Sequence, residues 1–178
     1  MSEEKEYGTV KRADVGDRII VLGCSGSGKS TFSRKLRDLT GLPLVPLDQI
    51  WWNADRTHIT RDEFDRRLRD VMRTEKWILD GDYSRTYEMR FAACDTVIFL
   101  DYPTEVCMEG IVGRVGTVRE DIPWTENRLD PELVKLVQDY REQNRPVVYE
   151  LMKRYPKERT FIFSSRQEAN RWLRDGER

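Results

Sequence analysis

The sequence predicts an α/β fold in which helices cover both faces of an open parallel sheet, and three observations lead to this prediction. Short apolar segments alternate with segments of helical period along the chain. Most of the apolar segments are continuous, as expected of strands buried on both faces. The first of them runs into a glycine-rich loop and then into a helix. At 178 residues, the chain fits one domain, which we place at residues 1–178.

Five segments have the pattern of strands, and turn or cap residues separate them. They are residues 18–22, 42–48, 77–81, 96–101 and 160–163. Thr60 and Ser165 are each followed three residues later by a glutamate, which is capping-box spacing, and Asp130 precedes a proline. We therefore expect a helix to begin at the residue after each of these three caps. Residues 1–17 show no clear period and are predicted to be an N-terminal arm.

Composition narrows the classes of function. The formal net charge is −1, without the basic footprint of a nucleic-acid-binding protein. The apolar run Val97–Leu100 is far shorter than the roughly 20 residues of a membrane span, and the amino terminus lacks the apolar core of a signal peptide. Three cysteines without a C-x-x-C pair suit a reducing compartment. We expect a cytoplasmic protein that binds neither membrane nor nucleic acid.

The glycine-rich loop carries the clearest chemical signal. Residues 23–31 read GCSGSGKST and fit the pattern G-x-x-x-x-G-K-[ST], in which backbone N–H groups and a helix N-terminus cradle phosphates. In that pattern Lys29 reaches the β- and γ-phosphates and the Ser30 hydroxyl holds Mg²⁺. We therefore predict ATP with Mg²⁺ as the cofactor. The loop residues predicted to bind ATP are Gly23, Ser25, Gly26, Ser27, Gly28, Lys29, Ser30 and Thr31.

Three aspartates follow predicted strands. Asp48, Asp80 and Asp101 are expected at the carboxyl ends of their strands, where open parallel sheets bind ligands. Carboxylates at that edge hold Mg²⁺ through water or accept a hydroxyl proton. We predict that all three converge on one rim, with Asp80 and Ser30 as metal ligands. Each aspartate taken alone is equally compatible with a helix cap or a turn.

Two adjacent tryptophans follow Asp48. In one interpretation Asp48 faces the hydroxyl of a phosphoryl acceptor and Trp52 forms an apolar wall beside it. In the other, the indoles cover the edge of the sheet, which we favour for Trp51. Residues 48–75 are accordingly predicted to be the acceptor-binding region, although the arginine-rich run 66–69 within it has the pattern of a solvated helix face.

Residues 77–114 resemble the adenylate-kinase superfamily, in which an LDG-x-x-R segment is followed by a strand ending in Asp and a helix ending in Arg. With GCSGSGKST, LPLVPLD followed by Trp52, and DG-x-YS, the chain is most similar to bacterial topology modulation proteins, which are small kinase-like P-loop proteins. The resemblance implies a three-layer P-loop NTPase fold with a five-stranded parallel sheet in strand order 2-3-1-4-5. It also implies a short lid at residues 115–129.

The same resemblance suggests roles for several side chains. Arg114 and Arg119 match arginines that flank the triphosphate from the lid, so that Lys29, Arg114, Arg119 and Asp48 are predicted to be catalytic and Arg114 also to bind ATP. Arg85 matches the arginine that grips an acceptor phosphate, with one extra residue after the LDG segment. The predicted acceptor-binding residues are Asp48, Trp52, Tyr83, Arg85, Arg90 and Arg141.

These features predict an ATP-dependent kinase that transfers a phosphoryl group to a nucleotide or a related hydroxylated metabolite. Arg85 favours an acceptor that already bears a phosphate, whereas Asp48 would suit a neutral hydroxyl compound, and both remain open. The alternative is a nucleotide-binding regulatory or DNA-topology-associated protein with weak ATPase activity. The chain has no N-K-x-D sequence of a guanine-specific switch.

Overall fold

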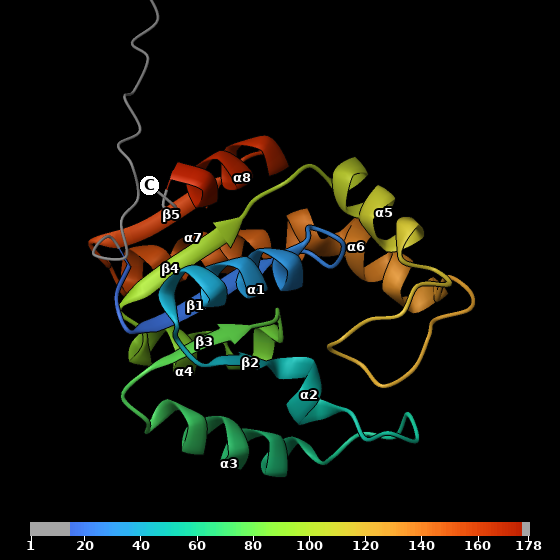
Figure 1. Ribbon diagram of the computed structural model, residues 1–178, viewed down its shortest axis with the longest axis horizontal. Helices are drawn as coiled ribbons and strands as arrows, with labels where there is room; N and C mark the ends of the chain where they lie inside the picture. The colour runs from blue at the N-terminus through green and yellow to red at the C-terminus, as the bar shows by residue number, and fades with distance from the viewer. Residues whose placement is uncertain (1–14, 176–178) are drawn as a thin grey trace, which may run out of the picture.

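The computed structural model describes residues 15–175 and has three layers, with helices on both faces of a five-stranded parallel sheet (Figure 1). The strand order is β2-β3-β1-β4-β5, which confirms the predicted fold and order. The strands are β1 Arg18–Gly23, β2 Leu44–Pro46, β3 Trp77–Asp80, β4 Thr96–Leu100 and β5 Arg159–Phe163.

The central strands form the core. Every residue of β3 and β4 is buried, as are the residues of β1 from Ile19 onward. This burial on both sides explains why these segments are continuously apolar. Val21 in β1 lies beside Asp80 in β3 and Ile98 in β4, so the carboxyl ends of the three strands reach the same edge.

The second strand is shorter than predicted. It ends at Pro46, after which Leu47–Trp51 forms the short helix α2. Proline has no backbone N–H to donate to a neighbouring strand, which suits this edge position and the end of the strand. Asp48 therefore lies in the first turn of α2, still beside the carboxyl edge of the sheet, and not on a strand.

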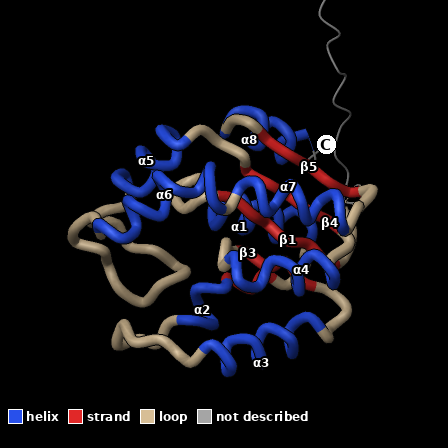
Figure 2. Tube along the Cα trace, turned by 180° about the vertical axis from the view of Figure 1, so that it is seen from behind, coloured by secondary structure: helices blue, strands red, loops and turns tan. Residues whose placement is uncertain are grey.

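The helices pack in two groups. Helices α1 and α8 contact each other on one face of the sheet, and α4 and α7 contact each other on the opposite face (Figures 1 and 2). The three predicted caps are present, since side chains of Thr60, Asp130 and Ser165 accept hydrogen bonds from backbone N–H groups in the first turn. Within residues 15–175, no helix is long and apolar enough to cross a membrane. The helices are α1 Lys29–Thr40, α2 Leu47–Trp51, α3 Arg61–Met72, α4 Tyr87–Ala93, α5 Thr104–Gly113, α6 Pro131–Gln143, α7 Arg145–Arg154 and α8 Arg166–Asp175, and Ser84–Thr86 forms a 3-10 turn.

Residues 15–17, which were predicted to belong to the N-terminal arm, are packed on the domain. Residues 1–14 of that prediction lie outside the described part of the chain. Val15 is buried, the Gly16 amide donates to Thr96 Oγ1 at 2.9 Å, and the Asp17 carbonyl accepts from the Trp77 amide at 2.8 Å. Residues 15–17 therefore belong to the packed domain.

The loop between β1 and α1 is in direct backbone contact with α5. A Cβ atom at Gly26, where φ is 82°, would lie 2.0 Å from the carbonyl oxygen of Cys107. A Cβ atom at Gly110 would lie 1.9 Å from the carbonyl oxygen of Gly26. Side chains are thus excluded at both positions, and α5 sets where the loop lies.

We predict that Gly110→Ala lowers the free energy of unfolding by about 1–3 kcal/mol, because the added methyl group must displace the loop backbone. Gly113→Ala is the matched control on the same helix, since a Cβ atom there would have nothing within 4 Å. That control is expected to be neutral or slightly stabilising. Urea unfolding of both variants measures the difference, and equal stabilities would show that the α5 contact does not restrain the loop.

Candidate functional site

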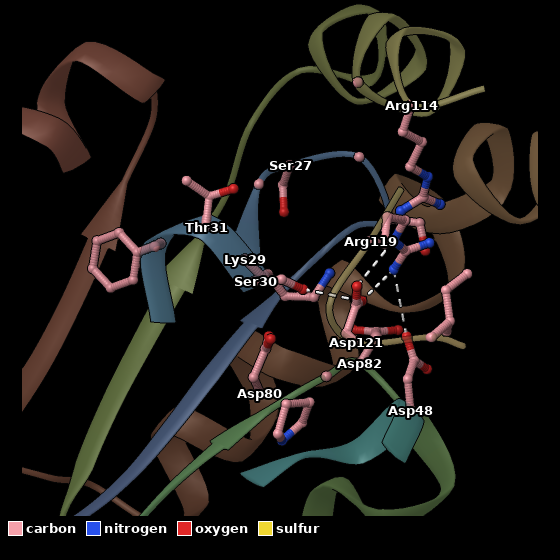
Figure 3. A pocket seen from close by; sticks show the side chains of 18 of the residues that line it. Ser27, Lys29, Ser30, Thr31, Asp48, Asp80, Asp82, Arg114, Arg119 and Asp121 are labelled. Atoms are coloured by element: carbon pink, nitrogen blue, oxygen red, sulfur yellow. Dashed lines mark hydrogen bonds and ion pairs between the residues drawn. The ribbon is translucent and has the colours of Figure 1, made fainter. Parts of the chain in front are cut away.

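A cleft of about 1040 Å³ runs along the carboxyl edge of the sheet. The loop at residues 23–31 forms one wall, and α2 with the residues after β3 forms another. The third wall is the irregular stretch between α5 and α6, residues 114–130, which we call the lid segment (Figure 1). Figure 3 shows side chains from all three walls pointing toward one another. The predicted edge of the sheet is therefore where the cleft lies.

The loop has the geometry of an anion site. Gly28, with φ 93°, is the N-cap of α1 and provides no side chain to cap the helix, and the first turn of α1 contains no acidic residue. A Cβ atom at Gly28 would have nothing within 4 Å, so the space above this helix end is open. Lys29 Nζ donates to the carbonyl oxygen of Cys24 at 3.0 Å, across its own loop. Free N–H groups, the helix dipole and Lys29 together favour phosphate.

Asp80 lies beside Ser30 on the floor of the cleft (Figure 3). It is 4% exposed, and its Oδ1 atom has no hydrogen-bond partner. Burial raises the pKa of Asp80 to about 6, although the Lys29 ammonium acts in the opposite direction. A buried carboxylate oxygen without a donor fits a position where a cation or a metal-bound water arrives with the ligand.

The donor set also fits Mg²⁺ that is carried by a nucleotide. Among residues 15–175, no group of three or more aspartate, glutamate, histidine or cysteine side chains is placed to hold a metal ion. Mg²⁺ at triphosphate sites takes most of its ligands from phosphates and water and only one or two from the protein. Ser30 and Asp80 are placed to supply those one or two protein ligands.

Asp121 in the lid segment also lines the cleft, and no sequence pattern marked it as a site residue. It is buried, and Ser30 Oγ donates to its Oδ2 atom at 3.5 Å. Arg119 Nε donates to Asp121 Oδ1 at 3.0 Å, and the second guanidinium nitrogen pairs with Oδ2. Burial opposes ionisation of Asp121, but the bonds and charge of Arg119 outweigh it and lower its pKa. An arginine–aspartate pair therefore lies directly over the Ser30 hydroxyl.

Both predicted lid arginines reach the cleft. Arg119 Nη1 is 3.3 Å from Glu126, and Arg114 Nε is 3.7 Å from the same carboxylate. Arg119 also lies 3.8 Å from Asp48 Oδ2 on α2 (Figure 3). The Glu126 carbonyl accepts from the Gly116 amide at 2.7 Å, which folds the segment back on itself. The lid segment is thus ordered around Glu126 and touches the opposite wall through Arg119.

Asp48 is held by Tyr83. The Tyr83 hydroxyl donates to Asp48 Oδ1 at 2.6 Å. Burial, and then the charge of Asp48, raise the pKa of Tyr83 far above its usual range, so it stays a donor. Tyr83 has φ 37° and stacks on Phe64 with ring centroids 5.0 Å apart. A non-glycine residue in the left-handed region is kept there by its surroundings, and it fixes the carboxylate on the cleft wall.

Both tryptophans after Asp48 line the cleft. Trp51 also packs against Phe64, at 5.6 Å between centroids, so it belongs partly to the core, as favoured from the sequence. Trp52 meets Trp124 of the lid segment edge to face, at 5.4 Å and 88°. The predicted wall at Trp52 therefore has a second half, Trp124, that the sequence did not reveal.

Arg85 and Arg141 lie outside the cleft, contrary to expectation. Arg85 lies in the 3-10 turn Ser84–Thr86 that follows the extra residue of the LDG segment, and this turn directs it toward α3. There it forms two hydrogen bonds with the Asp65 carboxylate, at 2.7 and 2.8 Å. Arg141 is exposed on α6. Neither guanidinium is placed to bind an acceptor in this structure.

Arg90 is fully buried and also does not line the cleft. Its guanidinium donates to the carbonyl oxygens of Gly81, at 2.9 Å, of Asp82, and of Tyr83, at 3.3 Å. Its Nε atom donates to Thr86 Oγ1 at 3.0 Å. Arg90 therefore holds the chain after β3 in position through these bonds. It does not line the cleft, although the sequence predicted it to bind the acceptor.

Asp101 does not converge with Asp48 and Asp80. Arg145 donates to its two oxygens at 2.7 and 2.8 Å, and the Tyr149 hydroxyl donates at 2.7 Å. The predicted rim thus contains two of its three aspartates, because α7 binds the third.

Asp82 is a further cleft residue that the sequence did not single out. Its carboxylate accepts hydrogen bonds from the hydroxyls of Tyr87 and Tyr140 and from Asn144 Nδ2, the last at 2.9 Å. These donors come from α4, α6 and the residue between α6 and α7. The DGDY sequence alone cannot predict partners that arrive about sixty residues later.

Solved structures with the same fold are kinases. Shikimate kinase from Bacteroides thetaiotaomicron aligns with a TM-score of 0.60 and 13% identity, covering 89% of this chain and 94% of that chain. Shikimate kinase from Acinetobacter baumannii in complex with shikimate aligns with a TM-score of 0.60 and 16% identity, covering 89% of both chains. A gluconokinase from Sinorhizobium meliloti 1021 aligns with a TM-score of 0.52 and 17% identity, covering 90% of this chain and 89% of that chain. The chain has the P-loop kinase fold. No protein-family model and no curated protein sequence matches it.

The burial of Asp80 yields a prediction for pH dependence. Its folded-state pKa of about 6 lies above its ordinary value of 3.8, so the fold binds this proton more tightly than the unfolded chain does. The free energy of unfolding should therefore fall as pH rises from about 4 to about 6, by up to about 3 kcal/mol for this group. Asp80→Asn should remove that fall and be more stable than the parent near neutral pH, with nucleotide and divalent cations absent.

Asp101→Asn is the matched control. Burial opposes ionisation of Asp101, but the hydrogen bonds from Arg145 and Tyr149 outweigh it and lower the pKa. This variant should therefore lose stability at neutral pH, the opposite sign. Urea unfolding across this pH range measures both. A stability difference between Asp80→Asn and the parent that does not change with pH contradicts the assignment.

Proposed function

We propose that this protein is a P-loop phosphotransferase that moves the γ-phosphoryl group of ATP to a hydroxyl group of a small molecule. One observation carries the proposal. A phosphate cradle with Lys29, two lid arginines and a fixed carboxylate, Asp48, line the same cleft. Water-excluding closure, positive charge and a proton acceptor are the parts that phosphoryl transfer requires. The kinase names of the structures with this fold support the same reaction class.

The nucleotide would lie along the loop. Residues 23–31 would hold its phosphates, and Ser30 with Asp80 would hold Mg²⁺, which neutralises phosphate charge when it is bound. The cleft continues past the loop to Phe32 and to Ala169 and Asn170 of α8, where a base attached to those phosphates has room. Arg166 Nη2 donates to the Gly26 carbonyl at 2.8 Å and fixes this end of the loop.

The chain's own residues divide the work of the transfer. Lys29, Arg114 and Arg119 would place positive charge around the transferred group as negative charge shifts in the transition state. Asp48 would accept the proton of the acceptor hydroxyl, with its position set by Tyr83. The lid segment would exclude water, which otherwise competes as the acceptor.

The acceptor region that we propose is narrower than the predicted residues 48–75. From that stretch only Asp48, Trp51 and Trp52 line the cleft, while α3 does not. We propose that these residues bind the acceptor together with Tyr83 and Trp124. The resemblance to topology modulation proteins rests on sequence motifs, and no feature of residues 15–175 adds to it.

Replacing the loop lysine tests the proposal. Lys29→Ala is expected to reduce phosphoryl transfer by about 10²–10³-fold while the fold is retained, because one charged donor to the developing charge is lost. ADP formation with Mg²⁺-ATP and a panel of hydroxylated acceptors measures it, and circular dichroism checks the fold. Lys153→Ala, at an exposed position of α7, is the control. Turnover by Lys29→Ala close to that of the control would refute the role of the loop.

The lid arginine gives a second test. Arg119→Ala is expected to lower kcat more than it lowers ATP affinity, because charge delivered by closure acts chiefly in the transition state. Arg128→Ala is the control, since Arg128 is exposed in the same segment and does not line the cleft. Steady-state kinetics and equilibrium nucleotide binding separate the two effects. An equal loss in both quantities would make Arg119 a simple binding residue.

A further inference from the structure

We infer that the acceptor is an uncharged ring compound with a free hydroxyl group, and not one that bears a phosphate or a carboxylate. The inference rests on the proposed kinase activity and names the substrate class of the same site. It comes from the juxtaposition of carboxylates and indoles on the wall formed by α2 and the residues after β3 and on the facing lid segment. We call this the acceptor pocket. It contains the residues proposed above to bind the acceptor together with Asp82, and its members are Asp48, Trp51, Trp52, Asp82, Tyr83 and Trp124.

The charge of the cleft is the first reason. The residues that line it include nine carboxylates and five cations. Lys29 and Arg166 contact the loop backbone, Arg34 lies 3.8 Å from Glu120, and Arg114 lies beside Glu126. None of these four contacts the acceptor pocket in the described residues. Of the five lining cations, only Arg119 therefore lies within ion-pair distance of Asp48 or Asp82, and like charges at close range disfavour an anionic acceptor.

Of the cations that line the cleft, Arg119 is the one that borders the acceptor pocket, while Arg56, which is not among the lining residues, has its guanidinium carbon 5.8 Å from the centroid of the Trp124 ring. Arg119 lies 3.8 Å from Asp48, but it also pairs with Asp121 and with Glu126, at 3.3 Å from the latter. Three carboxylates thus surround one guanidinium. When ATP enters, the proposed function assigns Arg119, with Lys29 and Arg114, to the transferred phosphoryl group. None of the lining cations then remains at the acceptor pocket for a second anion.

The arginines that would suit an anionic acceptor are used elsewhere. Arg85 is bound by both oxygens of Asp65, a carboxylate whose side chain is only 16% exposed. Arg90 donates its hydrogen bonds to backbone carbonyl oxygens and to Thr86 Oγ1. Moving either one into the cleft would leave a partly or fully buried group without a partner, which is strongly unfavourable.

The indoles are the second reason. Trp52 and Trp124 meet edge to face across the cleft, and each is only partly buried. Partly exposed indole faces bind flat, weakly polar ring faces, such as a nucleobase or the C–H face of a sugar ring. Because Trp124 belongs to the lid segment and Trp52 to the residue after α2, a bound ring would contact both walls. Acceptor binding and lid position are thereby coupled.

The hydrogen-bonding groups are the third reason. Asp48 Oδ1 accepts from Tyr83 at 2.6 Å, and an ionised carboxylate has further lone pairs to offer. A hydroxyl group donates to such an oxygen, whereas an ionised phosphate or carboxylate has no proton to donate. The pocket therefore selects the hydroxyl that is to be phosphorylated. A nucleoside and a sugar share this chemistry, and the experiment distinguishes them.

The test compares matched acceptors with the full-length protein and Mg²⁺-ATP. One arm pairs nucleosides with their 5′-monophosphates, and the other pairs neutral sugars with the corresponding sugar acids and sugar phosphates, with shikimate as a further carboxylate. ADP formation gives kcat/KM, and tryptophan fluorescence gives binding. The expected result is a neutral compound in one arm that exceeds its charged counterparts by about 100-fold or more in kcat/KM. A charged acceptor that is equal or better overturns the inference while leaving the kinase activity intact.

Two variants complete the test. Trp52→Ala is expected to raise the KM of the preferred acceptor by about 10-fold or more, with partial recovery in Trp52→Phe, and to leave ATP affinity unchanged. Arg85→Ala is the matched control and should leave the acceptor KM unchanged. A raised KM in Arg85→Ala overturns the inference, as does the absence of binding by every neutral ring compound to a protein that binds Mg²⁺-ATP. Failure to bind Mg²⁺-ATP at all would instead reject the proposed function.

Discussion

The contact between Gly26 and Gly110 is the constraint on which the arrangement of the site depends. Because these two backbones touch, the phosphate loop cannot move relative to α5 without breaking close packing. Helix α5 ends at Gly113, and the lid segment begins at the next residue, Arg114. The contact between the loop and α5 therefore also determines where the lid segment starts. The loop and the start of the lid segment are thus held as one unit by a contact between residues far apart in the sequence.

Arg90 has the corresponding role on the acceptor side. A buried guanidinium is tolerated only where its donors are satisfied, and here the carbonyl oxygens of residues 81–83 satisfy them. This holds the chain after β3 in an unusual course that includes the left-handed Tyr83. Tyr83 in turn fixes Asp48 through its hydroxyl. The orientation of the proposed proton acceptor, Asp48, thus depends on a buried cation that does not line the cleft.

The features that the sequence predicted well are those with local causes. Continuous apolar runs predicted all five strands, and side-chain caps predicted where three helices begin. The glycine-rich pattern predicted the loop between β1 and α1. The errors have non-local causes. Asp101 was assigned to the rim because strand ends meet there, but Arg145 and Tyr149 of α7 bind it. Arg85 was placed by its motif, and one added residue was enough to send it to α3. Asp121 and Trp124 lie in an irregular segment without period, where no pattern marks which side chain turns inward.

The charges over the loop give a physical reason for the lid to respond to its ligand. In this structure Arg119 is bound to Asp121, and Asp121 accepts from Ser30. Asp80 remains buried nearby with an oxygen that nothing satisfies. Phosphates entering the cradle would repel Asp121 and attract Arg119, while a cation arriving with them would satisfy Asp80. The phosphate would thus exchange one pair of opposite charges for another at Arg119, whereas the cation would give the buried Asp80 oxygen a partner that it lacks in this structure.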